Sequence, residues 1–461
     1  MKERLTRREL LRFAGLGSMV ALLASCAPKV VEVTKVVKEV VKETIIVAGT
    51  PQVVEKIVTV APAPSKPATI ETWDFGGSEF EFIDSAMIPE FNIQYPHITI
   101  KHVGIPEDGY WTKVRTTAAA GKPPDVFVFA DRKMCKQGVV LGLNDMLDVE
   151  GIDRKKDYPQ GVLHNYCMID DDVVYKMPTM AALWAGCYNK TLFEENGVTP
   201  LGPNDGYDFE DWYNMAKAIN KPSEDINKRI WGTDMVGLRY NNNVPKFAGE
   251  DGRTVVGNID SEGWINMYKW RARIWKEELT PYGDVGRMLG GSAFALGKIG
   301  ISQEDYAPLL KHREKGVDAV VSQFPKFPKE QDNAAVVGWS DCFSGSKATK
   351  ELDAVLAWLK YLGTDGAMTR SHLTHYPPMY LPYVEQMDWP AHNIQGPGVM
   401  ELLMGMPIYP FNPGVTEDPM EAFWTRITEG GEEIEPLIHE MAKEEQKELD
   451  KVWEEWEKLG K

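Results

Sequence analysis

Cysteine is scarce in this sequence, which has five cysteines in 461 residues. Cys26 is the only one before residue 135, and the other four, Cys135, Cys167, Cys187 and Cys342, form no Cys-x-x-Cys pair and no cluster with histidine. This spacing argues against a zinc site, because such sites use closely spaced ligands. Disulfides are permitted but not required, since a chain this long buries enough apolar surface to fold without them. We therefore expect no metal and no other cofactor.

The sequence also lacks an excess of positive charge. It has 51 Lys and Arg residues against 68 Asp and Glu residues, which gives a formal net charge of −17 at pH 7. A nucleic-acid partner would need a basic stripe or patch, so this class of partner is not expected. The acidic surface also disfavours an anionic ligand, although one pocket can differ from the average.

Motifs of the common enzyme classes are missing or incomplete. The segment Gly338 to Cys342 begins like the nucleophile elbow of a hydrolase but lacks its closing glycine. A segment that starts at Asn258 begins like a calcium loop, yet Lys269 stands at the twelfth position, where a bidentate glutamate is needed. No spacing selects a pair of carboxylates for glycoside hydrolysis, although distant acids could converge in a cleft. We therefore predict no catalytic residue.

A long hydrophobic run is absent, and the apolar N-terminal run, Phe13 to Ser25, is too short to span a bilayer comfortably. It follows a basic head, so residues 1–25 are typical of a secretory signal peptide. Residues 23–26, Leu-Ala-Ser-Cys, resemble the bacterial lipoprotein box, which implies that Cys26 is acylated and anchors the protein to a membrane. Residues 6–12 also resemble a twin-arginine signal, so this export route and the general secretory route both stay open.

Residues 26–66 differ in composition from the rest of the chain. Valine, lysine and glutamate dominate this segment, and aromatic residues are absent from it. Valines spaced by three and four between residues 30 and 40 leave a short coiled coil open. The segment has too few heptads to favour a coiled coil, and we interpret it as an extended or disordered tether. Behind an acylated Cys26, it would be a low-complexity stalk that lifts a folded body off the membrane.

From residue 67 the pattern becomes that of an α/β protein. Short apolar runs predict strands, and apolar residues every three or four positions predict helices. The expected strands are 68–77, 97–105, 125–131 and 298–303, and the expected helices are 85–96, 109–124, 208–220, 259–278, 347–363 and 432–461. Alternating elements over about 390 residues exceed a single core, which indicates two α/β lobes.

Five segments, taken in order, are similar to motifs of the family 1 extracellular solute-binding proteins of ABC importers, the group that includes maltose-binding protein. They read AAAGKPPDVFVFADR, YKMPTMAALWAGCYNKTLFEENGVTP, FALGKIGISQEDYAP, AVVGWSDCFSGSKATKELDAVLAWLKYL and PIYPFNPGVTEDPMEAFW. The resemblance implies a two-lobed, periplasmic-binding-protein-like (type II) α/β fold with a ligand cleft between the lobes. It implies residues 67–178 plus 338–375 for lobe 1, and residues 179–337 plus 376–461 for lobe 2.

The function that this resemblance implies is the binding and delivery of a solute, without a catalysed reaction. The lobes close on a small-molecule solute, and the protein, as a monomer, hands the solute to the permease subunits of an ABC transporter. A mono- or oligosaccharide is the expected solute. With the lipoprotein signal, the resemblance implies an extracytoplasmic protein anchored at the outer face of the cytoplasmic membrane.

A sugar presents apolar faces with rims of hydroxyl groups, so its site needs aromatic plates and a few polar groups. Trp73, Asp74 and Phe75 end the first strand, where open α/β sheets bind ligands. By resemblance, Phe129, Asp131 and Arg132 match the family's strand aromatic and its acidic-basic pair. The remaining candidates follow from the later motifs: Trp184, Glu304, Tyr306, Trp339, Tyr376 and Trp424.

Each candidate has a structural alternative. Trp73 could lie in the core while Asp74 caps a helix, and Asp131 could form a surface salt bridge with Arg132. Trp184, Trp339 and Trp424 could pack in the core or at the hinge. Between Pro178 and Trp184 the chain has no carboxylate, unlike sugar binders of the family, which argues against a strict maltose-like preference.

Two other functions stay open. A lipid-anchored carbohydrate-active enzyme would share the signal, the stalk and an aromatic cleft, but it would need two converging carboxylates. A solute sensor would share the fold and lack a permease partner. Among ligands, Asp74, Asp131 and Glu304 leave a cationic solute open, and Arg132 leaves an acidic sugar open.

Overall fold

The computed structural model describes residues 38–47, 50–59, 66–76, 80–128, 130–200, 208–234, 248–281, 285–289, 292–305, 316–322, 337–393, 396–406, 408–413, 420–428 and 430–459. The chain divides into two compact units, Met1–Lys66 and Pro67–Lys461. Two of the predicted ligand residues, Phe129 and Tyr306, and the predicted lipid attachment point, Cys26, lie outside the described residues.

The described residues of the first unit form an antiparallel hairpin. Strand β1 (Lys38–Val47) pairs with β2 (Thr50–Thr59) in a register that places Thr44 opposite Val53. This differs from the unpaired tether that the composition predicts. Valine, isoleucine and threonine are frequent in both segments, and these β-branched residue types favour strands.

The second unit is built on an eight-stranded sheet of order β4-β3-β5-β10-β6-β8-β7, in which β9 also pairs with β6. Strands β3, β4 and β5 are parallel, whereas β10 pairs antiparallel with both β5 and β6. The strand bounds are β3 Ala68–Asp74, β4 Ile98–Gly104, β5 Val126–Val128, β6 Met177–Asn189, β7 Trp231–Thr233, β8 Ile299–Asp305, β9 Ala319–Ser322 and β10 Val337–Gly345.

Helices surround this sheet. In chain order they are η1 Ile83–Met87, α2 Ile88–Gln94, α3 Glu107–Ala119, α4 Arg132–Lys136, α5 Asn144–Val149, α6 Gln160–Val162, η2 Leu163–Cys167, α7 Lys190–Glu195, α8 Phe209–Ile219, α9 Glu262–Lys276, α10 Val285–Leu289, α12 Leu352–Gly363, α13 Asp365–Thr374, α14 Leu381–Gln386, α15 Trp389–His392, α16 Gly396–Met404, α17 Met420–Thr428 and α18 Ile434–Lys458. Of these described helices, none combines the length and the apolar character that crossing a membrane requires.

The predicted alternation of strands and helices is confirmed, with differences at the element ends. Strand β5 ends at Val128, before the predicted end at residue 131, because Asp131 begins a helix as its N-cap. Helix α12 begins at Leu352 and not at residue 347. Thr349 explains this delay: its Oγ1 accepts from the Glu351 amide at 3.2 Å and donates to Asp125 Oδ1 at 2.7 Å, which holds the preceding residues in a turn.

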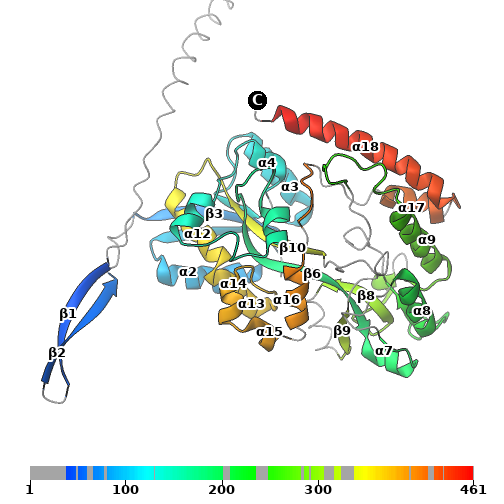
Figure 1. Ribbon diagram of the computed structural model, residues 1–461, viewed down its shortest axis with the longest axis horizontal. Helices are drawn as coiled ribbons and strands as arrows, with labels where there is room; N and C mark the ends of the chain where they lie inside the picture. Colours follow the sequence, from blue (N-terminus) through cyan, green and yellow to red (C-terminus); the bar gives the residue numbers. More distant parts are fainter. Residues whose placement is uncertain are drawn as a thin grey trace, which may run out of the picture. The chain divides into compact units, whose positions relative to one another are not determined.

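Two hydrophobic clusters form the core of the second unit. The larger one contains Phe91, Trp358 and Tyr361, with the rings of Phe91 and Trp358 at 4.9 Å between centroids. The smaller one contains Trp212 and Tyr268. Figure 1 shows β3, α2 and α12 at one end of this unit and α7, α8 and α9 at the other, with β6 running between them. This is the two-lobed arrangement that the sequence predicts.

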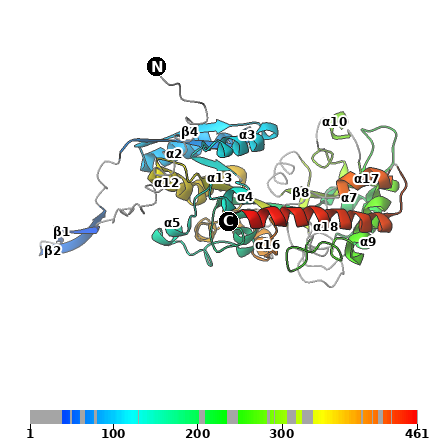
Figure 2. The same ribbon diagram turned by 90° about the horizontal axis from the view of Figure 1, so that it is seen from above.

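The C-terminal helix α18 joins elements of both clusters. Its Leu449 belongs to the smaller cluster and its Trp456 to the larger one. Trp456 Nε1 donates to Asp170 Oδ2 at 2.9 Å, and Trp453 Nε1 donates to the Gly252 carbonyl at 3.0 Å. Figure 2 shows α18 as a long straight helix that starts beside α17.

Candidate ligand site

Backbone pairing brings three predicted ligand residues to the junction of β10, β6 and β8. On β6, Ala182 lies opposite Trp339 of β10, and Ala185 lies opposite Glu304 of β8. Trp184 stands between these two positions of β6. The side chains of Trp184, Glu304 and Trp339 lie outside the described part of the structure. The junction therefore places their backbones within a few positions of one another, and their contact with a ligand stays a prediction.

The aromatic residues at the end of β3 have protein partners. Trp73 is 7% exposed, its indole N–H donates to Glu71 Oε1, and Lys113 Nζ lies 4.6 Å from its ring centroid. Phe75 is half-buried, with its ring centroid 4.6 Å from that of Tyr110. Trp73 thus lies in the core, whereas Phe75 retains partial exposure at this strand end.

Asp74 forms a buried charged group with two neighbours. Its side chain is fully buried, and its Oδ2 lies 2.5 Å from Nε2 of His102, whose Nδ1 lies 2.8 Å from Asp84 Oδ2. Burial by itself lowers the pKa of His102, but hydrogen bonds and negative charge from Asp74 and Asp84 outweigh it and raise the pKa to about 8. At neutral pH, a protonated His102 therefore balances the charge of Asp74.

The turn after β3 has room only for glycine. Gly76 has a φ of +67°, and a Cβ on it would lie 3.0 Å from the Gly104 Cα at the end of β4. This close approach lets the Gly76 amide donate to Asp74 Oδ1 at 2.7 Å. From α3, the Tyr110 hydroxyl donates to the Val128 carbonyl at 2.8 Å and so ties α3 to the end of β5. Burial and the charge of Asp74 raise the pKa of Tyr110, which keeps this hydroxyl protonated as a donor.

Asp131 stands where α4 begins, three residues after the end of β5. Its Oδ1 accepts from the Met134 amide at 2.8 Å, which makes it the N-cap of α4. Its Oδ2 lies 3.1 Å from Arg115 Nε, and the two side chains are 26% and 61% exposed. Asp131 pairs with Arg115, and it keeps a surface that a ligand can reach.

The neighbouring Arg132 points to main-chain oxygen atoms. Its Nη1 donates to the Asn412 carbonyl, and its Nη2 donates to the Asn165 carbonyl at 3.3 Å. Its guanidinium also lies 5.3 Å from the ring centroid of Phe411. Burial lowers the pKa of Arg132. These contacts assign Arg132 a structural task, because it holds η2 and residues 411–412 against α4.

Tyr376 and Trp424 lie in two different places. Tyr376 is half-buried in the segment after α13, and the next residue, Pro377, accepts from the Ala181 amide of β6 at 3.3 Å. This hydrogen bond brings Tyr376 close to β6. Trp424 is half-buried on α17, and the Arg271 guanidinium lies 4.4 Å from its ring centroid.

Sequence reasoning misses a buried polar cluster between helix α13 and the paired strands β6 and β10 (the crossing strands). Arg370 of α13 is 3% exposed, and it donates to Asp341 Oδ2 of β10 and, at 3.2 Å, to Thr179 Oγ1 of β6. Thr179 Oγ1 in turn donates to the Asp341 carbonyl at 2.8 Å. The cluster ties both crossing strands to one helix. Its sequence signal is a charged residue inside a strand, Asp341, which needs a buried partner.

His102 is also missed, although the pattern of β4 could have indicated it. Ile98 and Ile100 are buried, and alternation places residue 102 on the same face of the strand. In the parallel register, Thr72 lies opposite His102, which puts Asp74 only two residues further along β3. An imidazole on an inward face beside a strand-end carboxylate predicts an ion pair.

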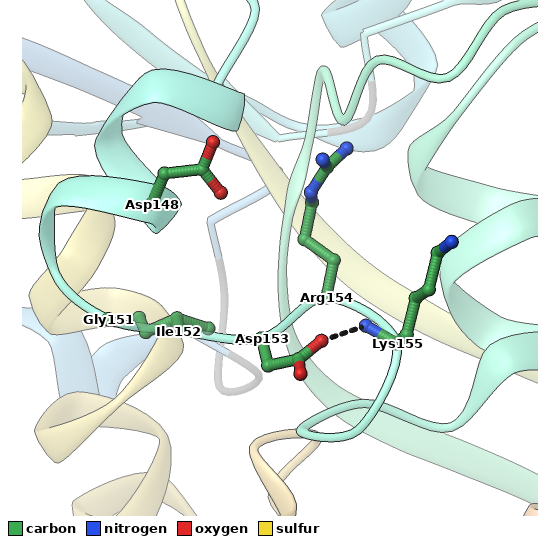
Figure 3. A pocket seen from close by; sticks show the side chains of 6 residues that line it. All are labelled: Asp148, Gly151, Ile152, Asp153, Arg154 and Lys155. Atoms are coloured by element: carbon green, nitrogen blue, oxygen red, sulfur yellow. Dashed lines mark hydrogen bonds between the residues drawn. The ribbon is translucent and has the colours of Figure 1, made fainter.

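A surface pocket of about 330 Å³ lies in a different region. Figure 3 shows that its lining comes from the end of α5 and the turn after it: Asp148, Gly151, Ile152, Asp153, Arg154 and Lys155. Asp153 Oδ1 accepts from the Lys155 amide at 3.0 Å, and Arg154 Nη1 donates to the Asp172 carbonyl at 3.0 Å. This pocket is formed by one loop and contains none of the described ligand candidates, so it is not the candidate site.

A family model for bacterial extracellular solute-binding proteins matches residues 76–369. The match spans more than half of the chain, and this chain therefore belongs to the bacterial extracellular solute-binding protein family. The resemblance that the five motifs predict is confirmed. The matched range includes both crossing strands, β6 and β10. A comparison with curated proteins finds no match.

Solved structures confirm the two-lobed type II fold. The GacH receptor of Streptomyces glaucescens has 17% identity and a TM-score of 0.66, with 84% of this chain and 99% of that chain covered. An ABC transporter solute-binding protein from Thermotoga lettingae, bound with α-D-tagatose, has 19% identity and a TM-score of 0.64, with 84% and 100% covered. The sugar-binding protein MalE from Xanthomonas citri has 15% identity and a TM-score of 0.67, with 85% and 100% covered.

Proposed function

We propose that this chain is a lipid-anchored solute-binding protein that captures a carbohydrate by closing its two lobes and delivers it to an ABC transporter permease. The observation that carries the proposal is the paired crossing of β6 and β10 in a chain of this family. The proposal includes the lobe boundaries and the stalk over residues 26–66 that the sequence predicts.

The crossing supplies the physical basis for closure. Strand β6 pairs with β10 through Met177–Trp184 and with β8 from Trp184 onward. Two hydrogen-bonded strands thus join the parts of the sheet that belong to different lobes. A solute that contacts both lobes only when they are closed shifts the open–closed equilibrium by its differential affinity. We expect it to bind at the β10–β6–β8 junction, where strand pairing brings the backbones of Trp184, Glu304 and Trp339 within a few positions of one another.

Carbohydrate is the solute class that two observations support. The structure of the GacH receptor includes a complex with acarbose, and the Thermotoga lettingae protein is bound with α-D-tagatose. The junction of this chain carries two tryptophans, and tryptophan rings cover the apolar faces of sugars. A cationic solute is less favoured, because Asp74 is already paired with His102.

A ligand screen on the compact unit Pro67–Lys461 tests this function. Thermal unfolding is followed with mono- and oligosaccharides, amino acids and polyamines, and each sample is then analysed for ligand breakdown. A ligand at a hundred times its Kd adds about 2.7 kcal/mol of stability, an upward shift of about 3 °C for a unit of this size. A saturable shift with the sugar recovered intact supports the proposal. Cleaved sugar would establish an enzyme instead, and a shift with amino acids or polyamines alone would overturn the carbohydrate assignment.

Two variants test the location of the site. We expect Trp184→Ala and Trp339→Ala each to weaken binding of the identified sugar by about 10- to 100-fold, as for loss of a central aromatic contact. Trp275→Ala is the matched control, since Trp275 is half-buried on α9 and is not a predicted ligand residue. Isothermal titration calorimetry measures all three. Equal losses in the control and the junction variants would reject the junction as the site.

The anchor and the permease need a separate experiment in cells. Full-length protein should fractionate with membranes, and Cys26→Ser should release it, because a chain without acyl groups loses its membrane affinity. Uptake of the identified sugar by cells that also carry the cognate permease should fall in Cys26→Ser. Membrane association that survives this substitution would reject the lipid anchor.

A further inference from the structure

Two of the four described cysteines meet in the core of the second unit. The Sγ atoms of Cys167 and Cys342 lie 3.5 Å apart, although the two residues are 175 positions apart in the sequence. They are 0% and 1% exposed. Cys135 and Cys187 are also buried, and none of the four is joined to another by a disulfide in the structure.

Local backbone geometry aims the two sulfur atoms at each other. Cys167 is the last residue of η2, and its carbonyl accepts from the Tyr175 amide at 2.9 Å, which fixes that end of the segment. On β10, the register against β6 shifts between Asp341 and Cys342. Such a bulge redirects the side chains next to it. The Cys342 thiol also donates to the Ser340 carbonyl at 3.0 Å.

Closing the pair into a bond needs little movement. A disulfide has an S–S distance of about 2.05 Å, so each sulfur atom would move by less than about 1 Å. Packing of two reduced thiols in an apolar core is the alternative, since cysteine behaves there as a small hydrophobic residue. The family is extracellular, and disulfides form and persist outside the cytoplasm, which favours the bond.

We propose that Cys167 and Cys342 form a disulfide bond in the exported protein. The bond would close a loop that contains β6 and the elements that follow it in the chain, among them α7, α8, β7, α9, β8 and β9. It would fasten β10 to η2 beside Asp341, which already pairs with Arg370. Strand β10 would thus be fixed to the first lobe at Cys342, and closure would bend the strands beyond that point.

The oxidant is the disulfide form of a thiol–disulfide exchange protein outside the cytoplasm. One cysteine thiolate attacks a sulfur of this carrier, which gives a mixed disulfide and releases one carrier thiolate. The second cysteine thiolate then attacks the sulfur of the first cysteine, which forms the Cys167–Cys342 bond and expels the other carrier thiolate. Two protein thiols lose two protons and two electrons, and the carrier disulfide becomes a dithiol.

Burial of the two cysteines determines at which stage of folding this exchange can happen. Burial raises the pKa of the Cys167 thiol, and its hydrogen bond with Cys342 raises it further. Both side chains are almost fully buried, so a thiol–disulfide carrier cannot reach either sulfur atom, and the folded pair resists both oxidation and reduction. The bond therefore forms while the chain folds, before β10 closes over η2, and it then withstands reductants until the protein unfolds.

Peptide mapping tests the pair directly. Full-length protein is isolated from cells with its own export signal, denatured, alkylated with N-ethylmaleimide without reductant, and digested with trypsin. We expect peptides 157–176 and 330–347 to be joined, and the peptides with Cys135 and Cys187 to be alkylated. The same map is made after refolding of reduced protein in a glutathione redox buffer, which does not depend on the proposed export.

The two preparations separate the possible failures. A link that forms on refolding but not in cells shows that the two thiols can pair, but it overturns the bond in the exported protein; a chain that is already folded when it is exported, as in twin-arginine export, would give this result. Separately alkylated peptides in both preparations overturn the pair. Cys167→Ala and Cys342→Ala should each lower the unfolding temperature of the exported protein by about 3–6 °C. The double variant should match the single ones, whereas independent packing losses would add; Cys187→Ala is the buried control.

Discussion

Asp74 is the last residue of β3 and Asp131 follows the neighbouring parallel strand β5, yet the two carboxylates have different environments. Asp74 is fully buried and balanced by His102, whereas Asp131 is partly exposed, caps α4 and pairs with an exposed side chain, Arg115. The difference comes from the adjacent strand. β4 places an imidazole beside the end of β3, and β5 has no such charged neighbour among its described contacts. A strand-end carboxylate therefore becomes a scaffold group or an accessible group according to the residue that the next element brings to it.

The largest expected effect is the loss of the Asp74 carboxylate. Asp74→Ala removes the acceptor of the Gly76 amide and the partner of His102 Nε2, so that His102 keeps only Asp84, and breaking such a buried pair costs about 3–5 kcal/mol. Urea unfolding of Pro67–Lys461 measures the free energy of unfolding. Asp131→Ala is the matched control. A loss as small as that of the control would contradict the difference between the two carboxylates.

The next effect is a pH dependence from His102. Its pKa is about 8 in the folded chain and about 6.5 in the unfolded chain, so its stabilisation is complete below pH 6.5 and is lost as the pH rises through 8. The shift corresponds to about 2 kcal/mol between pH 6 and pH 9. In His102→Asn, the free energy of unfolding measured with urea at each pH should lack this decrease between pH 6 and pH 9. Identical profiles for the two proteins would refute the assignment.

Asp131 is expected to matter less for stability and more for the ligand. Asp131→Ala should lower the free energy of unfolding by about 1 kcal/mol through loss of the N-cap, while Asp131→Asn keeps a capping acceptor and should change it little. If Asp131 contacts the solute, Asp131→Asn should still weaken binding by about 10-fold, through loss of a charge-assisted hydrogen bond. Calorimetric titration with the identified sugar decides this, and an unchanged Kd would remove Asp131 from the site.

The smallest effect is expected at Arg115. Its side chain is 61% exposed, and exposed ion pairs contribute about 0–1 kcal/mol. Arg115→Ala should therefore change the free energy of unfolding by less than about 0.5 kcal/mol, and added salt should reduce even that. A larger loss of unfolding free energy that persists at high salt would contradict this, because it would mean that the Arg115–Asp131 pair stabilises the fold as the buried Asp74–His102 pair does.

The sequence predicts the fold well because its signals are local. Strand β5 is an uninterrupted apolar run, and α18 has an apolar stripe along one face, so each element can be predicted without its neighbours. The short strands β7 and β9, three and four residues long, have no comparable pattern and are not predicted. Neither is the hairpin of β1 and β2, because we interpret the valine-rich composition of residues 26–66 as that of an extended or disordered tether.

The site is harder to predict because its contacts are distant in sequence. Arg370 and Asp341 are 29 residues apart, and Thr179 is 191 residues from Arg370. Only the antiparallel register of β6 with β10 brings them together. The motifs include both β6 and β10, but they do not show that Trp73 is buried or that Arg132 is held by carbonyl groups. Those facts depend on packing and not on local pattern.

The position of β10 has a consequence for the order in which the protein is made. This strand lies in the middle of the sheet between β5 and β6, but the ribosome adds it roughly 200 residues after β5. At about 5–20 residues per second, β5 waits about 10–40 s for this partner. During this interval β5 presents an open strand edge, a surface that invites pairing with other chains. The newly made chain therefore needs a chaperone most between the synthesis of β5 and the completion of β10 at Gly345.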